Sequence, residues 1–207
     1  MTEDYVISNE EELQSIIGEP LDFINLKVCK SLDESMTGFI GRSPLIFLST
    51  IDASGLVDTS PKGDAPGFVH IDDSGDLLIP DRPGNKLTFG FKNILHNDSI
   101  GLIFVVPTMR ETLRVKGRAV LSRDPALLDA LAAQGKPAVL CTRVRVEECF
   151  FHCGKAMIRS RMWQPDQWAT YDDAPLVKQL NKAMGGDEAL EKMLADGIEE
   201  NYRDELY

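Results

Sequence analysis

The sequence predicts a mainly β fold of the α+β class, in which an antiparallel barrel of six or seven strands is flanked by helices at both ends. Short apolar runs separated by tight Asp, Ser and Gly turns fill the middle of the chain, while helical periodicity dominates its two ends. With 207 residues and 43% hydrophobic content, the chain can build one well-packed core. Helices interrupt the strands only twice, which favours an antiparallel barrel over a parallel nucleotide-binding sheet.

Two short helices are expected before the first strand. Ser8 stands three residues before Glu11, as in a capping box, and Gly18 provides a stop. A second helix is expected from Pro20 to about Ser31. We therefore assign residues 1–43 to N-terminal helices.

Six strands are expected as three pairs. "PLIFLSTIDASGLVDTS" and "GFVHIDDSGDLLIP" each read as two strands around an Asp-containing turn that ends in glycine. "SIGLIFVVP" and "ETLRVKGRAVL" form the third pair, the latter with apolar and basic residues in alternation. This pattern is typical of a small antiparallel barrel.

A helix, a seventh strand and a helical tail complete the chain. "DPALLDALAAQG" reads as an Asp-capped helix ended by glycine, and "AVLCTRVRVEECFF" as the seventh strand. The barrel is thus predicted over 44–150, within a single domain spanning 1–207. Amphipathic patterns in 151–207 predict short helices, which need the barrel or a partner subunit to pack on.

Composition excludes several classes of protein. The longest apolar run, Ile100 to Val106, is far below the roughly 20 residues of a membrane-spanning helix, and the acidic start lacks the features of a signal peptide. Four cysteines are too few for a disulfide scaffold and suggest free thiols in a reducing compartment. A net charge of −11 disfavours nucleic-acid binding. We expect a cytoplasmic protein with neither a membrane nor a nucleic acid as its partner.

Charge is distributed unevenly along the chain. Residues 82–161 contain 14 Lys or Arg against 6 Asp or Glu, so this segment carries +8 while the rest carries −19. A basic middle in an acidic chain favours a local site for a small anion. The alternative is that strands and strand edges are simply rich in Lys and Arg.

The stretch "LLIPDRPGNKLTFGFKNIL" joins a strand to a helical pattern. Asn85 is placed to cap a helix beginning near Lys86, and Arg82 adds a further charge. These features predict a phosphate site, although the spacing is not that of a P-loop. An ordinary strand-to-helix turn is an equal alternative from the local pattern.

The order of "TSPKG", "LLIPDRPGNK", helix, "SIGLIFVVP" and "ETLRVKGRAVL" resembles the pyridoxamine 5'-phosphate oxidase-like family of FMN-binding split β-barrels. The resemblance covers roughly Leu45 to Leu121. It implies that Lys62 and the pair Asn85-Lys86 hold the flavin phosphate; Asn85 stands where the family usually has Arg, and Arg82 could restore that charge.

The same resemblance implies further contacts and a partner. The backbone of Thr59, Ser60 and Pro61 would run along one edge of the flavin ring, with Ile79 and Pro80 near its other side. Thr112 occupies the position where many relatives have a flavin-bonding Gln. The family further implies a homodimer with the flavin at the interface.

The segments with which true pyridoxamine phosphate oxidases complete their site are absent, and "ECFFHCGKAMIRSRMW" stands in their place. Its Cys149, His152 and Cys153 lack the spacing of a zinc site, so we expect no metal. If the stretch is helical, its basic residues share a face that could bind an anionic substrate, namely Lys155, Arg159 and Arg161. The alternative is a solvated helix surface.

Two classes of function remain open. The first is an FMN-dependent oxidoreductase that acts on a small, anionic substrate or reductant, with no protein acid or base identified. The second is a non-catalytic flavin- or haem-binding module, because one fold hosts many functions. No order of residues typical of a hydrolase is readable.

Overall fold

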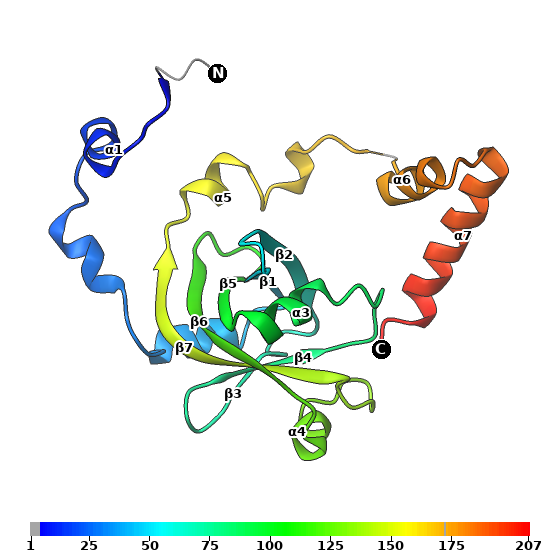
Figure 1. Cartoon of the computed structure of the whole chain (residues 1–207), viewed down its shortest axis with the longest axis horizontal. Helices are drawn as coiled ribbons and strands as arrows, with labels where there is room; N and C mark the ends of the chain where they lie inside the picture. The colour runs from blue at the N-terminus through cyan, green and yellow to red at the C-terminus, as the bar shows by residue number, and fades with distance from the viewer. Residues whose placement is uncertain (1–4, 172) are drawn as a thin grey trace.

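The chain folds into a seven-stranded antiparallel sheet that curls into a split β-barrel (Figure 1), in a computed structural model that describes residues 5–171 and 173–207. The strands lie in the order β2-β1-β5-β6-β7-β4-β3. Their bounds are β1 Leu45–Ile51, β2 Val57–Gly63, β3 His70–Ile71, β4 Leu77–Asp81, β5 Ser99–Val105, β6 Thr112–Ser122 and β7 Leu140–His152. The predicted mainly β split barrel with flanking helices is confirmed.

The helices lie before, around and after this sheet. Their bounds are α1 Glu10–Ile17, η2 Asp22–Lys27, α2 Glu34–Ile40, α3 Phe89–His96, α4 Pro125–Ala130, α5 Lys155–Arg159, η3 Pro165–Gln167, α6 Pro175–Ala183 and α7 Glu188–Asp204. In Figure 1, α1 and the pair α6 and α7 stand away from the barrel on opposite sides. Among the described residues, no helix has the length and hydropathy needed to cross a membrane.

The first two hairpins use the same turn. The carboxylate of Asp52 accepts hydrogen bonds from the N–H groups of Ser54 and Leu56, at 2.8 and 2.9 Å. Asp72 does the same for the next hairpin, and a glycine with positive φ follows in each turn. Because these signals are local, the sequence predicts both hairpins correctly.

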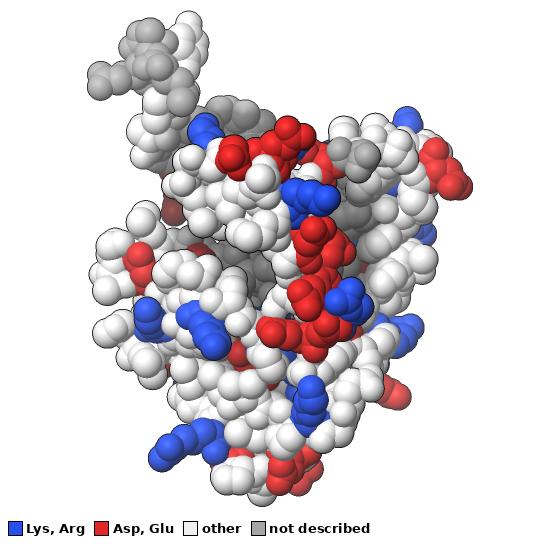
Figure 2. Space-filling model, turned by 90° about the vertical axis from the view of Figure 1, so that its right-hand side faces the viewer, with Lys and Arg blue, Asp and Glu red and all other residues white. Residues whose placement is uncertain are grey.

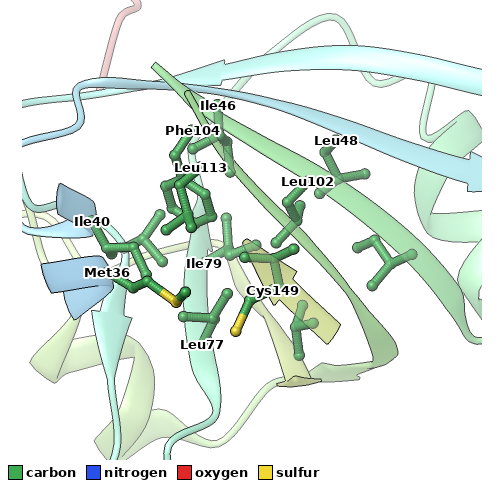
Figure 3. Close-up of a cluster of buried hydrophobic side chains, with 14 of the residues drawn as sticks. Met36, Ile40, Ile46, Leu48, Leu77, Ile79, Leu102, Phe104, Leu113 and Cys149 are labelled. Atoms are coloured by element: carbon green, nitrogen blue, oxygen red, sulfur yellow. The ribbon is translucent and has the colours of Figure 1, made fainter. Parts of the chain in front are cut away.

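Inward side chains of the strands form one main core. Ile46, Phe104 and Leu113 come from three neighbouring strands and are fully buried, and α2 adds Met36 and Ile40 from one side (Figure 3). Burying each such side chain stabilises the fold by about 1.5–3 kcal/mol. A smaller cluster under α4 consists of Leu78, Leu131, Ala138 and Cys141.

A β-bulge bends the longest ladder. The register between β6 and β7 shifts between Lys116 and Gly117. A Cβ atom on Gly117 would lie 2.1 Å from the carbonyl oxygen of Arg145, so only glycine allows this close approach of the backbones.

The predictions of helices are less accurate than those of strands. The first helix is confirmed, but its cap is Asn9 rather than Ser8. The second is wrong in extent, because only the 3₁₀ turn Asp22–Lys27 forms within it, and α2 was not expected. The Asp-capped helix forms at Pro125–Ala130, and the helical tail forms as α6 and α7.

Candidate cofactor site

The barrel is split between β2 and β4. β2 is an edge strand, while β3 pairs with β4 only at Leu77 and Leu78. No strand pairing joins β2 to β4 in the described part of the chain. Side chains bridge this seam instead.

Two ion pairs cross the seam. The Nζ atom of Lys62 lies 2.7 Å from a carboxylate oxygen of Asp81, joining β2 to β4. Just beyond the two strands, Nε of Arg82 donates to Asp64 at 2.8 Å. We call these four residues the seam cluster. It brings together two of the basic residues that the sequence assigns to phosphate binding, although they are 20 positions apart in the chain.

The register of β2 directs Lys62 toward the inside of the barrel. Lys62 lies opposite Ile46, which is fully buried, and directly opposed residues point to the same face. Its ammonium lies 4.8 Å from the centre of the Phe91 ring, on α3. The Lys62 side chain is nevertheless 25% exposed, so it remains within reach of a ligand in solvent.

Asp64 is the most enclosed member of the seam cluster, with a side chain only 4% exposed. Burial raises the pKa of its carboxyl group, but hydrogen bonds from the Tyr207 hydroxyl, the Ala65 N–H and Arg82 together outweigh this effect. The pKa of Asp64 therefore lies below its ordinary value, and the carboxylate stays ionised opposite Arg82 at neutral pH.

The seam cluster carries no net charge, because its two cations face two carboxylates. A phosphate would therefore compete with Asp64 and Asp81 for the same cations. Figure 2 shows basic and acidic side chains interspersed on the face that it presents, without one large basic patch. Lys62 has ammonium hydrogens beyond the one bonded to Asp81, and Arg82 has N–H groups beyond those bonded to Asp64 and the Leu131 carbonyl. The donor set thus fits a phosphate, provided that the other contacts of the ligand offset its competition with the two carboxylates.

The loop before α3 differs from the prediction. The helix begins at Phe89, so the expectation that Asn85 caps a helix beginning near Lys86 is wrong. The Asn85 side chain instead accepts a hydrogen bond from the N–H of Leu87 at 3.1 Å, within the loop. Lys86 and Thr88 both have positive φ, and Lys86 is exposed in the loop that follows β4.

The predicted flavin-edge residues of β2 lie on both faces of the strand. Thr59 shares a hydrogen bond of 2.9 Å with Ser49 on the outer face, and Pro61 is exposed there too. Ser60 lies opposite Leu48 and is half-buried. Beside Ser49, a groove of about 470 Å³ crosses the outer face of β1, β5 and β6.

The remaining predicted flavin contacts are buried or distant. Ile79 belongs to the main core and Pro80 is also buried, so neither side chain is exposed to a ligand in solvent. Thr112 begins β6 opposite His152, and β1 and β5 separate β6 from β2. On the other side β7 lies between β6 and β4, but Thr112 pairs with its far end, whereas β4 pairs with residues 140–144, so strand pairing does not bring Thr112 next to β4.

The proposed substrate residues lie beside Thr112. α5 is a single turn that carries Lys155 and Arg159, while Arg161 follows it with φ of 53°. The indole N–H of Trp163 donates to the carbonyl oxygen of Met109 at 2.7 Å and fixes the segment on the loop before β6. All three cations are exposed.

The neighbouring sulfur and imidazole groups do not converge. Cys149 is buried in the main core, whereas His152 and Cys153 are exposed at the end of β7. Within residues 5–171 and 173–207, no group of three or more His, Cys, Asp or Glu is placed to hold a metal ion.

Sequence reasoning missed four residues around the seam: Asp64, Asp81, Phe91 and Tyr207. Asp64 stands two positions after Lys62, and Asp81 directly precedes Arg82, so both could have been suspected from their place in "PKGD" and "IPDRP". Nothing in the local pattern indicates Tyr207, which is 143 positions from Asp64.

The chain matches several solved structures and one family model. A search of curated protein sequences found no match. Among solved structures, the chain is similar to HupZ of Group A Streptococcus, with 18% identity over 58% of this chain and 93% of HupZ and a TM-score of 0.47. It is similar to a candidate pyridoxamine 5'-phosphate oxidase of Lactobacillus delbrueckii, with 22% identity over 59% and 95% of the two chains and a TM-score of 0.47. An F420 reductase matches with 17% identity over 57% and 98% of the two chains, at a TM-score of 0.42.

The family model described as pyridoxamine 5'-phosphate oxidase matches residues 32–153. This range includes α2 and all seven strands. Since the match covers more than half of the chain, the protein belongs to the pyridoxamine 5'-phosphate oxidase family.

Proposed function

We propose that the protein binds FMN and is an FMN-dependent oxidoreductase acting on a small, anionic substrate or reductant. The observation that supports this most is the seam cluster, where a chain of this family brings Lys62 and Arg82 together at a half-buried position. Lys62, Arg82 and the exposed Lys86 would hold the phosphate, with Asn85 in the same loop.

The protein's own residues have binding and shielding roles in this proposal. The backbone of Thr59, Ser60 and Pro61 would line one edge of the flavin, with that of Ile79 and Pro80 on the other. Phe91 stands against Lys62 and limits the water around its ammonium group. FMN, when bound, supplies the chemistry of hydride or electron-pair transfer, and no protein acid or base is required.

A second copy of the chain would complete the site. Thr112 begins β6 and α5 follows the end of β7 that pairs with it, so Thr112 and the cations of this segment lie together, away from the residues of β7 that pair with β4 at the seam. A homodimer with the flavin at its interface would let Thr112, Lys155, Arg159 and Arg161 of one copy approach the seam of the other. We further propose that residues 1–207 act as one domain and that the protein works in the cytoplasm, a reducing compartment in which the resting state of its four cysteines is the thiol.

The visible absorption spectrum of the protein purified and then supplied with FMN tests the proposal. Bound flavin gives a spectrum that haem or an empty barrel does not mimic, and its reduction by a nicotinamide nucleotide followed by reoxidation would demonstrate turnover. Bound FMN without turnover would favour the non-catalytic module. A haem spectrum, or failure to retain FMN at micromolar concentration, would refute the FMN assignment.

A further inference from the structure

Cys29 and Cys149 face each other outside the regular ladder. The N–H of Cys29 donates to the carbonyl oxygen of Cys149 at 2.9 Å, and the N–H of Cys149 donates to that of Cys29 at 2.8 Å. Two residues that exchange both bonds in an antiparallel bridge have Cα atoms about 5.5 Å apart. This separation lies inside the range of about 4.4–6.8 Å found in disulfides, and directly opposed side chains leave the backbone on the same face.

The two thiols share one environment. Cys149 is fully buried in the main core (Figure 3), and Cys29 packs against the same cluster while remaining partly exposed. The Cys149 thiol lies 3.2 Å from the carbonyl oxygen of Ser31 and 3.6 Å from that of Cys29, so it is directed toward the segment that carries Cys29. The other two cysteines differ from this pair, since Cys141 belongs to the smaller core cluster and Cys153 is exposed.

We propose that Cys29 and Cys149 form a reversible dithiol–disulfide pair that hydrogen peroxide oxidises. The thiolate of Cys29 attacks the peroxide, the O–O bond breaks, and Cys29 becomes a sulfenic acid while one water is released. The sulfur of Cys149 then attacks the sulfur of Cys29 and displaces the second water. Two thiols thus lose two electrons and two protons, which reduce one hydrogen peroxide to two waters. An external thiol reverses the reaction by exchange.

The order of these steps follows from exposure. Cys29 is partly exposed and can react with the oxidant, whereas Cys149 is fully buried and is not accessible to it. Burial, followed by the nearby Cys29, Asp33 and Glu148, raises the pKa of the Cys149 thiol to about 11. The second step therefore runs slowly at neutral pH and accelerates as the pH rises, because the attacking species is the thiolate.

The disulfide would anchor the N-terminal arm, residues 5–28, at its root. The side chains of this arm that the structure describes are all exposed, and α1 buries none. In the reduced protein, the bridge at Cys29 consists of two backbone hydrogen bonds. Closing the disulfide needs a small approach of the two Cβ atoms, which Cys29 can supply because it lies outside the regular strands.

Peroxide treatment of the full chain, followed by alkylation, trypsin digestion and mass spectrometry, tests this proposal. Cleavage after Lys27 and Lys30 places Cys29 on one short peptide, and cleavage after Arg145 and Lys155 places Cys149 together with Cys153 on another. We expect the peptide Val28–Lys30 to be linked to the peptide Val146–Lys155, with a loss of two hydrogens that dithiothreitol restores. The rate of disulfide formation should rise about tenfold per pH unit between about pH 7 and 9.

Variants separate this pair from its neighbours. Cys153→Ser, which leaves Cys149 as the sole cysteine on its peptide, should retain the link, and Cys141→Ser should retain it as well. Cys29→Ser and Cys149→Ser should each abolish the link. Because Cys149→Ser alters the core, the variant of the partly exposed Cys29 gives the cleaner test. A link that persists in Cys149→Ser, or oxidation of Cys29 to sulfinic acid with no link in the parent protein, would overturn the proposal.

Discussion

The pair Asp64–Arg82 shows how single residues hold the seam. Arg82 bonds both the Asp64 carboxylate and the carbonyl oxygen of Leu131, so one guanidinium connects the seam to the α4 region. Tyr207 donates to the same carboxylate at 2.8 Å. Several donors around one enclosed carboxylate make this pair more than a surface ion pair, which typically contributes about 0–1 kcal/mol.

Asp64 should make stability depend on pH. Since its folded pKa lies below 3.8, its contribution is present above that pH and is lost as the pH falls through the folded pKa. Asp64→Asn should lower the free energy of unfolding by about 1–3 kcal/mol at pH 7 and by less at pH 3. Urea unfolding at the two pH values measures this difference. The exposed turn variant Asp73→Asn is the control and should have little effect at either pH; equal losses for Asp64→Asn at both values would contradict the account.

At this scale, sequence predicts which residues carry charge but not which charges meet. Lys62 and Arg82 were identified as basic residues next to a strand end. Their carboxylate partners follow from the curl of the sheet, which brings the ends of β2 and β4 together. No local sequence pattern indicates that these strand ends meet, so the zero net charge of the seam cluster could not be predicted.

Among the elements, β6 depends most on a glycine. Gly117 lies where the β-bulge brings the β7 backbone closest, whereas Gly101 on β5 would place a Cβ no nearer than 3.9 Å from Ser49. Gly117→Ala should therefore lower the free energy of unfolding by about 2 kcal/mol or more, because the backbones must separate. The control Gly101→Ala should be neutral or slightly stabilising. Chemical denaturation compares the two, and similar stabilities would show that the bulge tolerates a Cβ.

The segment after β7 should select anions. We expect Arg159→Ala to leave FMN binding nearly intact but to weaken an anionic substrate or product analogue roughly tenfold, an effect that shrinks as salt screens the charge. Titrating holo-protein with a panel of anions, followed by flavin absorbance, measures this. Arg123→Ala removes an exposed arginine elsewhere and is the matched control. If Arg159→Ala responds like this control, α5 is a solvated surface and binds no substrate.

Strand prediction succeeds here because each hairpin carries its own turn signal. The start of α3 fails for an equally local reason: the Asn85 side chain bonds the N–H of Leu87 inside the loop, an arrangement that competes with helix capping. α2 was missed because it has only seven residues, one of them Gly38, and the cap at Asp33 has no long periodic run behind it. Short helices are defined by packing more than by pattern.

The whole molecule exposes apolar surface that a second copy could cover. Phe47 and Ile103 are adjacent on the outer face of the sheet, and each is more than one-third exposed. Together with the separation of Thr112 from the seam, this exposure favours the homodimer.

Light scattering of the flavin-loaded protein at micromolar concentration should give a mass near twice the 23.0 kDa of one chain. Phe47→Asp, which places charge on the outer face, should reduce that mass toward one chain, while Leu56→Asp in the exposed first turn should leave it unchanged. A mass near one chain for the parent protein would contradict the dimer.

Three strand pairs, β1–β2, β3–β4 and β5–β6, were predictable from local patterns because their members are adjacent in the chain. The pairings β1–β5 and β4–β7, which join these pairs into one sheet, leave no such local pattern. The closure of the barrel was not predictable either, because it rests on side chains that meet across the seam. The central claim, that the seam cluster holds the flavin phosphate, therefore needs a measurement that isolates the phosphate.

That measurement is the ratio of FMN affinity to riboflavin affinity, since the two ligands differ only in the phosphate. Charge-assisted hydrogen bonds contribute about 1.5–3 kcal/mol, so Lys62→Ala should lower the ratio by about ten- to a hundredfold, while the exposed control Lys192→Ala leaves it unchanged. Asp81→Asn, which removes a competing carboxylate, should raise the ratio roughly threefold or more. A ratio that stays within a factor of two of the parent in both seam variants would contradict the phosphate assignment.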